Sequence, residues 1–234
     1  MHFRHSSRIW AEYPELVAGT AVVNSLVQGP PDVGRVGPRL QYWTRQAERR
    51  MAGKSVAELA EVQAWRRAYS KMGLKATQYR CASEALLRRL RKEGSLPRVH
   101  PMVDLCNALS AAYAVPVAAF DVAEISGSLE VRHATGDEIY MSFAGEEENP
   151  APDEVIFADE AGGAHARRWA NRQSGRSAVR TETTDVLIVA EAMHLSAPAD
   201  MEALVSTLGQ EIEQIWGVQA TTARLSAQAP LFWF

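Results

Sequence analysis

The stretch RVHPMVDLCNALSAAYAVPVAAFD, residues 98–121, holds within eight positions a His, an Asp, a Cys and an Asn, types that bind metals or take part in catalysis: His100, Asp104, Cys106 and Asn107. Pro101 suits the first position of a helix, so we expect a helix over residues 101–113. A helix turns by about 100° per residue, so Asp104 and Asn107 share one face. Cys106 lies about 200° from Asp104 on the same helix, and we expect its thiol in the core.

This spacing gives little support to metal or thiol chemistry. His100 and Asp104 are four residues apart, as metal ligands on a helix often are, but His100 falls at the helix start and no third ligand is evident. A thiolate nucleophile needs a nearby base, and the local spacing supplies none to Cys106. We therefore expect no metal and no cofactor.

The face that carries Asp104 and Asn107 has two interpretations. The pair can tie a neighbouring loop through hydrogen bonds. Alternatively, it lines a pocket, where the Asn107 amide offers one acceptor and two donors to a polar ligand. The residues alone favour neither.

The bulk composition limits the classes of protein to consider. The chain has 234 residues, of which 47% are hydrophobic and 23% charged, which is ordinary for a globular protein with a sizeable core. No apolar run approaches the length of about 18 residues that spans a bilayer, and the N-terminus lacks the apolar segment of a signal peptide. The two cysteines, Cys81 and Cys106, have no CxxC spacing. We expect a cytoplasmic protein with no membrane partner.

The small net charge of −3 hides a strong asymmetry. Residues 1–100 hold 18 Lys and Arg against 8 Asp and Glu, whereas residues 101–234 hold 7 against 20. Either the basic part meets a polyanion, or the two parts attract each other within the fold. A basic run, Arg88 to Lys92, ends one predicted helix, where cations also favour the helix dipole.

Hydrophobic periodicity and turn residues predict an α+β fold: a helical N-terminal region, then a mostly β body of mixed or antiparallel sheets with packed helices. We divide the chain at residues 74 and 75, with both parts expected in one compact unit. A capping box, Ser55 with Glu58, begins one helix. The predicted helices are 46–51, 55–72, 76–94, 101–113 and 200–216. The predicted strands are 15–27, 128–134, 138–144, 154–159, 163–170, 184–192 and 218–226, with loops at 28–38 and 146–153 and an apolar LFWF packed on the body.

Three segments together resemble a known family. The run SEALLRRLRKEGSLPRVHPMVDLCNALSAAYAVPVAAFD, with VRHATGDEIYMSFAG and RTETTDVLIVAEA, is similar to the B3/B4 editing domain of the bacterial phenylalanyl-tRNA synthetase β subunit. The resemblance covers roughly residues 75–195. The motifs HPMVDLCN, ATGDE and RRWANR look closer to the stand-alone members of this family, which are not fused to a synthetase.

The resemblance implies a trans-editing deacylase that hydrolyses the ester of a mischarged tRNA, such as one carrying the arginine mimic canavanine. The alternative is a non-catalytic module that binds tRNA or a small amino-acid-like ligand. The expected partner is the acceptor arm and 3′ end of a tRNA, not DNA. The basic residues expected to contact it are Lys71, Lys75, Arg88, Arg89, Arg91 and Lys92.

Residue by residue, the resemblance places Asn107 in the lining of the editing pocket and Glu191 where the misacylated side chain is read. Gly175 falls where the family keeps a Gly-Gly turn, and Ala118 replaces the family histidine, so the pocket is expected to read an amino acid other than tyrosine or to rely on other groups. No residue is certain to be catalytic. Asn107, with His100 as a neutral imidazole, is expected to position water.

The segment RRWANRQSGR, residues 167–176, is read as a strand whose alternation puts Arg172 on one face and Trp169 and Asn171 on the other. It is either a solvated basic strand or a pocket wall, where Arg clamps phosphate and Trp stacks on a base. Glu191 ends an apolar strand, so its carboxylate needs a partner or a ligand, for which a cationic side chain is suited. Asp137 follows Thr-Gly, as a turn residue or as one facing the pocket.

Overall fold

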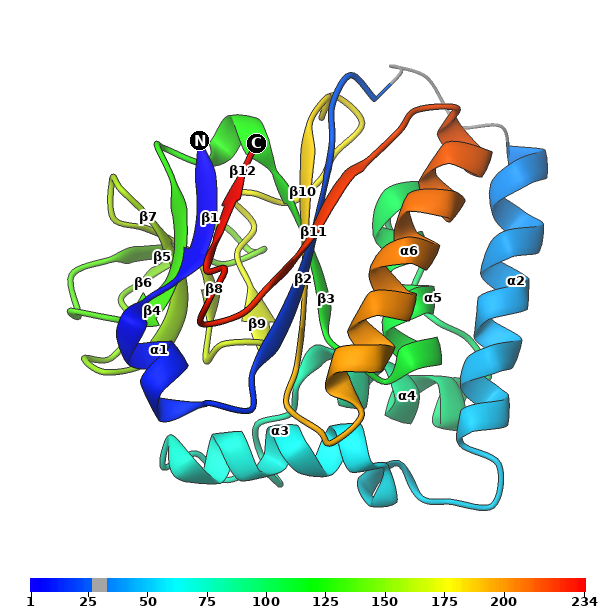
Figure 1. The fold of residues 1–234 in the computed structure, drawn as a ribbon, viewed down its shortest axis with the longest axis horizontal. Coiled ribbons are helices and arrows are strands. Elements are labelled where there is room, and N and C mark those ends of the chain that lie inside the picture. The colour runs from blue at the N-terminus through cyan, green and yellow to red at the C-terminus, as the bar shows by residue number, and fades with distance from the viewer. Residues whose placement is uncertain (27–32) are drawn as a thin grey trace.

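The computed structural model describes residues 1–26 and 33–234. The described chain is α+β, as predicted, with two sheets and packed helices (Figure 1). The helices are α1 (Ser7–Glu12), α2 (Val33–Arg50), α3 (Ala60–Lys71), α4 (Ala82–Glu93), α5 (Pro101–Tyr113) and α6 (Ala197–Trp216), with short 3-10 turns at Val56–Glu58 and Val122–Glu124. Among the described residues, no helix combines the length and apolar character that crossing a bilayer requires.

The strands form a mixed sheet and an antiparallel one. The larger sheet has the order β12-β1-β4-β7-β8-β5-β6, with β9 paired to β8, and contains parallel pairs at β1–β4 and β5–β8. The smaller sheet has the order β11-β2-β10-β3 and is antiparallel throughout. The strands are β1 (His2–His5), β2 (Val17–Val23), β3 (Val117–Asp121), β4 (Leu129–His133), β5 (Ile139–Met141), β6 (Glu147–Glu148), β7 (Val155–Asp159), β8 (Gly163–Arg167), β9 (Arg172–Gln173), β10 (Val186–Ala192), β11 (Thr221–Leu225) and β12 (Leu231–Trp233).

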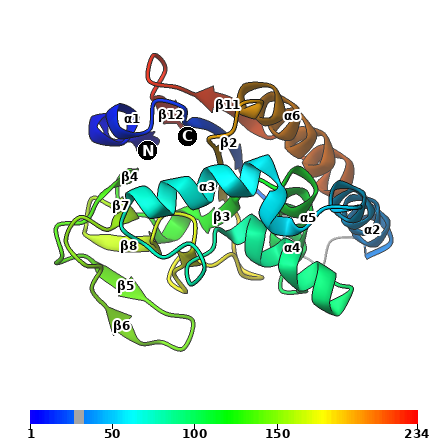
Figure 2. The ribbon, with the colours of Figure 1, turned by 90° about the horizontal axis from the view of Figure 1, so that it is seen from below.

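The elements stack in three layers. The larger sheet faces the smaller sheet, and α2, α4, α5 and α6 lie beyond the smaller sheet (Figure 1). Helix α3 runs across one end of the molecule, beneath both sheets (Figure 2). The antiparallel sheet is therefore covered on both faces, which explains why every residue of β10 is buried.

Strand β10 divides its side chains between two cores. Leu187 and Val189 belong to the core between the sheets, whereas Val186 and Ile188 belong to the core against the helices. Because side chains alternate along a strand, Glu191 has the parity of Leu187 and Val189 and faces the space between the sheets. The alternation thus carries a carboxylate into an apolar interior.

The helices are spread along the chain, so the prediction that they gather in the N-terminal region is wrong. Strand β1 lies between β12 and β4, and β2 lies between β11 and β10. The first part of the chain therefore supplies strands to both sheets. We propose, in line with the expectation from the sequence, that the parts on either side of residues 74 and 75 form one compact unit.

Several predicted boundaries need correction. The Ser55–Glu58 capping box is confirmed, but it begins only a 3-10 turn, and an extended Leu59 separates that turn from α3. The helix predicted over 76–94 begins at Ala82, after a turn region, and ends as expected at a left-handed Gly94. Of the loop predicted over 28–38, residues 28–32 lie outside the described part, and the remainder is helical despite Pro38.

Candidate functional site

A small cavity lies between the two sheets. Its volume is about 60 Å³, and its walls come from β3, β7, β8, β9, β10, the α4 start and the segment between β8 and β9. Apolar side chains form most of the wall. The polar side chains at the cavity are Trp169, Asn171, Arg172, Gln173 and Glu191. Four of these five, all except Gln173, are residues for which the sequence predicts substrate contact.

Glu191 is the buried carboxylate of this cavity, and only 3% of the residue is exposed. Its Oε1 accepts a hydrogen bond from Nε1 of Trp169 at 2.7 Å and lies 2.6 Å from Nε2 of His5. Within residues 1–26 and 33–234, Oε2 has no hydrogen-bond partner. A buried carboxylate is costly unless it is paired, so His5 and Trp169 account for its burial and leave the second oxygen available.

Trp169 reaches Glu191 from a tight turn rather than from a strand. Arg168 and Trp169 both adopt left-handed backbone conformations, with φ of 47° and 56°, between the paired residues Arg167 and Arg172. The strand alternation predicted over residues 167–176 is therefore wrong. A left-handed conformation is strained for a residue with a Cβ. The full burial of the Trp169 indole supplies the packing that holds the turn.

The neighbouring polar side chains are held by the protein itself. Nδ2 of Asn171 donates to the carbonyl oxygen of Arg80 at 2.7 Å, and Nε2 of Gln173 donates to that of Ala119 at 2.7 Å. Arg172 forms an ion pair with Glu148 at 2.8 Å. These bonds fix the polar wall of the cavity before any ligand arrives.

Ala118 lines the same cavity, opposite Val189 of β10 in the sheet register. This is the position where the resemblance stated from the sequence implies a histidine. A methyl group in place of an imidazole leaves more room and removes one donor or acceptor. The polar character of the cavity therefore depends on Glu191 and on the segment 169–173.

The other predicted site residues lie outside this cavity. Asn107 is half-buried on α5, and His100 caps that helix, with Nδ1 accepting from the Met102 amide at 3.3 Å. Burial lowers the pKa of His100. Asp137 is exposed in a turn, where it accepts a hydrogen bond from Thr135. Gly175 lines a separate hollow beside Ser142, and an added Cβ there would lie 2.9 Å from the Ser142 carbonyl oxygen.

The structure accounts for two residues of the 98–121 stretch. Oδ1 of Asp104 accepts from the Val99 amide at 2.8 Å, so Asp104 ties the preceding loop. Cys106 is 1% exposed and belongs to the core between the smaller sheet and the helices, as predicted. Burial raises the pKa of its thiol to about 12, which leaves it protonated and unreactive at neutral pH.

Most of the predicted basic contacts have partners within the protein. Arg88 pairs with Glu84 and Arg89 with Glu93, both at 2.8 Å. Lys71 lies 4.5 Å from the centre of the Tyr13 ring. Arg91 donates to the carbonyl oxygens of two preceding loop residues, Met51 and Lys54. Lys75 and Lys92 are exposed and have no such contact among the described residues.

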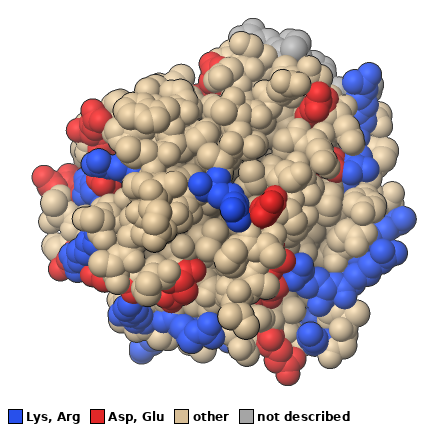
Figure 3. Space-filling model, viewed as in Figure 1, with Lys and Arg blue, Asp and Glu red and all other residues tan. Residues whose placement is uncertain are grey.

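Both interpretations of the charge asymmetry have support. Ion pairs join the basic first part of the chain to the acidic second part at Arg4–Glu130, Arg8–Asp153 and Arg39–Glu211. In Figure 3, Lys and Arg side chains also gather along the margin of the molecule where α2 lies. Some of the basic side chains thus form ion pairs within the fold, and others are exposed on the surface.

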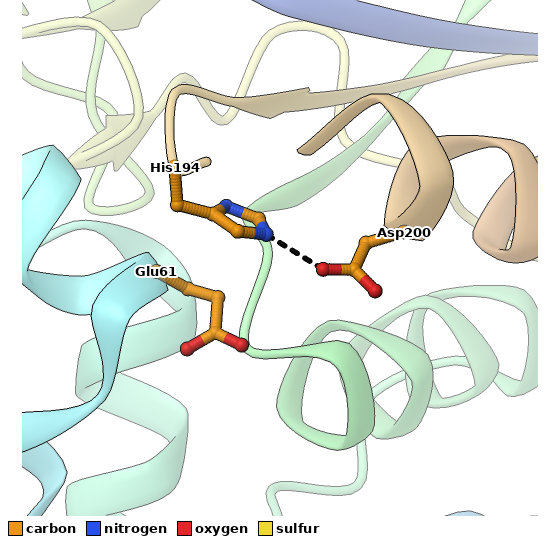
Figure 4. Close-up of side chains that lie close together, drawn as sticks. All are labelled: Glu61, His194 and Asp200. Carbon is orange, nitrogen blue, oxygen red and sulfur yellow. Dashed lines mark hydrogen bonds and ion pairs between the residues drawn. The ribbon is translucent and has the colours of Figure 1, made fainter. Parts of the chain in front are cut away.

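A second polar cluster lies where α3 meets the turn between β10 and α6. Glu61, His194 and Asp200 place one ligand-type atom each within 4.8 Å of one another (Figure 4). Nε2 of His194 lies 2.7 Å from Asp200, and Glu61 forms an ion pair with Arg50. The guanidinium already supplies a cation, so we assign this cluster to holding the elements together. Sequence spacing gave no indication of it.

The two-sheet fold, with a buried carboxylate between the sheets, defines the class of protein. A model of the B3/4 domain matches residues 64–201, which is more than half of the chain. The chain therefore belongs to the B3/4 domain family, which confirms the resemblance stated from the sequence.

The relatives are much longer proteins. The chain is 32% identical over 150 residues to the phenylalanine–tRNA ligase beta subunit of Nocardia farcinica (strain IFM 10152), covering 62% of this chain and 18% of that protein. It is 28% identical over 116 residues to the corresponding subunit of Photorhabdus laumondii subsp. laumondii, covering 49% and 14%. The chain thus spans less than a fifth of the length of these relatives.

A solved structure shares the fold. The N-terminal fragment of the phenylalanyl-tRNA synthetase beta subunit from Pyrococcus horikoshii superposes with a TM-score of 0.50, covering 95% of this chain and 53% of the fragment. Sequence identity is 10%, so this likeness concerns the fold alone. The match extends beyond the 64–201 segment and includes most of the N-terminal part.

Proposed function

We propose that this protein is a trans-editing aminoacyl-tRNA deacylase, which hydrolyses the ester between a wrong amino acid and the 3′-terminal ribose of a tRNA. The family relationship to the synthetase beta subunit supports a tRNA substrate. Charged tRNA is used in the cytoplasm, where the protein would act.

The single observation that carries the proposal is the arrangement around Glu191. Its carboxylate is buried at the cavity, is held at one oxygen by Trp169 and His5, and has its other oxygen without a partner among the described residues. An oxygen of this kind is suited to a ligand group that donates hydrogen bonds, and best to a cationic one. A guanidino group meets this need, which supports an arginine mimic such as canavanine as the amino acid removed.

Hydrolysis of an aminoacyl ester needs little chemical activation by the protein. The aminoacyl ester is already activated, so holding it and placing a water molecule account for much of the barrier. Among the described residues that line the cavity, none is Ser, Thr, Cys or His. The groups in reach of an ester carbonyl and a water are the amides of Asn171 and Gln173 and the guanidinium of Arg172.

The tRNA would be held outside the cavity. We propose that exposed basic side chains contact phosphates of the acceptor arm. Lys75 and Lys92 are the first candidates, because they form no such contact with other described residues. Some predicted site residues lie outside the cavity, so we propose only a supporting role for them. They are Asn107, Gly175, Asp137 and His100.

The test is deacylation of a panel of charged tRNAs by the purified protein, including arginine tRNA carrying arginine or canavanine. One charged species is expected to be hydrolysed at least tenfold faster than the others, and Glu191→Ala is expected to remove that preference. Asn107→Ala tests the supporting role proposed for this residue, which lies outside the cavity. Hydrolysis of no species at any enzyme concentration would refute the proposal.

One observation favours a second candidate function. Ala118 lines the cavity where the family pattern has a histidine, so a catalytic or recognition group is replaced by a methyl. The second candidate is a non-catalytic module that binds tRNA or a small amino-acid-like ligand. It predicts salt-sensitive tRNA binding without any deacylation in the same panel.

A further inference from the structure

His5 comes from a part of the chain that the family model does not include. The matched segment begins at residue 64, and His5 lies on β1, 186 residues before Glu191. Strand β1 pairs in parallel with β4, and this pairing carries His5 into the space between the sheets. The side chain of His5 is completely buried there.

The direction of the hydrogen bond follows from the chemistry. A carboxylate oxygen can only accept, so Nε2 of His5 carries the proton that it shares with Oε1 of Glu191. Trp169 donates to the same oxygen from the turn that follows β8. Two donors from separate elements fix the carboxylate, and its Oε2 is then the oxygen left for a ligand.

The imidazole is itself held in place by aromatic rings. Phe3 lies edge-on to it with ring centroids 5.2 Å apart, and Trp10 lies at 4.9 Å. Nδ1 of His5 is buried and has no hydrogen-bond partner among the described residues. Among the described residues, the only polar contact of the His5 ring is therefore the one to Glu191. We infer that the buried imidazole is there to bind that carboxylate.

We propose that His5 is a positioning residue of the site: it holds Oε1 of Glu191 so that Oε2 meets a cationic, hydrogen-bond-donating end of the substrate's amino-acid side chain. This inference rests on the proposed function. It gives the N-terminal strand, which lies outside the family match, a part in substrate selection.

The test compares two amide variants of similar polarity. In His5→Gln the amide nitrogen takes the place of Nε2, whereas in His5→Asn it falls short. One tRNA transcript is loaded with arginine, canavanine or citrulline, since citrulline matches arginine in shape but lacks the charge. Hydrolysis is followed for the wild type and both variants, with melting temperatures measured alongside.

We expect the wild type to prefer a guanidino side chain over citrulline by at least tenfold in kcat/KM. His5→Asn should lose most of this preference through KM, and His5→Gln should keep it, at similar melting temperatures. Hydrolysis with an unchanged preference in His5→Asn would overturn the role of His5 and leave the deacylase intact. No hydrolysis by the wild type would instead refute the proposed function.

A second measurement observes ligand binding in the wild-type protein and needs a variant only to assign one signal. The wild-type protein, labelled with ¹⁵N at histidine, is titrated with arginine amide and with citrulline amide, and His5→Gln identifies the His5 signal. The Nε2 signal of His5 should shift with arginine amide and not with citrulline amide. A His5 signal unmoved by both, in protein that hydrolyses charged tRNA, would overturn the inference.

Discussion

The indole of Trp65 meets the indole of Trp169 edge to face, with ring centroids 5.2 Å apart. Both residues are essentially fully buried in the core between the sheets. They differ in hydrogen bonding: Nε1 of Trp169 donates to Glu191, whereas Nε1 of Trp65 has no partner among the described residues. The pair therefore separates the contribution of packing from that of the hydrogen bond.

Trp169→Phe is expected to lower the free energy of unfolding more than Trp65→Phe, by roughly 1 to 3 kcal/mol, because it leaves a buried carboxylate with one donor fewer. Urea unfolding followed by circular dichroism measures both variants. Equal losses would mean that Trp169 contributes only its volume. Trp65→Phe removes a nitrogen that is already unpaired, so it reports the loss of ring packing.

Ala118→His is expected to fill the cavity. The cavity volume of about 60 Å³ holds only a few water-sized groups, and an imidazole would occupy most of it. Hydrolysis of the preferred charged tRNA should fall at least tenfold, and Ala118→Ser should change it little. Deacylation assays with both variants measure this change in hydrolysis. Undiminished hydrolysis by the histidine variant would place the substrate elsewhere.

Glu138 predicts how stability depends on acid. Burial alone would raise the pKa of this carboxyl, but the Thr135 amide, Arg132 and the Gly136 amide bond to it and hold the pKa at about 2, against 4.5 ordinarily. A lowered folded-state pKa adds stability that is fully present above pH 4.5 and is lost as the pH falls toward 2. The loss should be on the order of 2 to 3 kcal/mol.

Unfolding free energies measured between pH 6 and about pH 2 test this dependence. Glu138→Gln should flatten the curve in that window, because the amide does not titrate. Glu146→Gln, in the exposed loop that follows β5, is the matched control and should leave the curve unchanged. A curve that is equally steep in Glu138→Gln would assign the acid sensitivity to other carboxylates.

The surface lysines predict a salt dependence of tRNA binding. Lys75→Ala and Lys92→Ala should each weaken binding and reduce the slope of log K against log salt by about one unit, because each removes one phosphate contact. Filter binding over a range of salt concentrations measures the slope. Arg224→Ala, on β11, serves as the control. Slopes that stay at the wild-type value would remove these lysines from the tRNA interface.

The sequence predicted well what depends on local pattern and on resemblance. The apolar run ending at Glu191 is a strand. Cys106 is core, as helix geometry required. These predictions succeed because the period of an element fixes which side chains share a face.

What the sequence did not predict depends on contacts between distant segments. Nothing near His5 indicates a carboxylate 186 residues away, and the parallel pairing of β1 with β4 has no local signature. The turn at Arg168 and Trp169 lacks the Gly or Asn that marks a left-handed position, so the local pattern predicts a strand there. Burial of the indole overrides the local preference there.

The separation of His5 from Glu191 has a consequence during synthesis. Translation adds about 5 to 20 residues per second, so a gap of 186 residues corresponds to roughly 10 to 40 s during which His5 has been made and Glu191 has not. Throughout that time the nascent chain has the His5 donor but lacks the carboxylate that it holds, so this buried pair forms only late in synthesis.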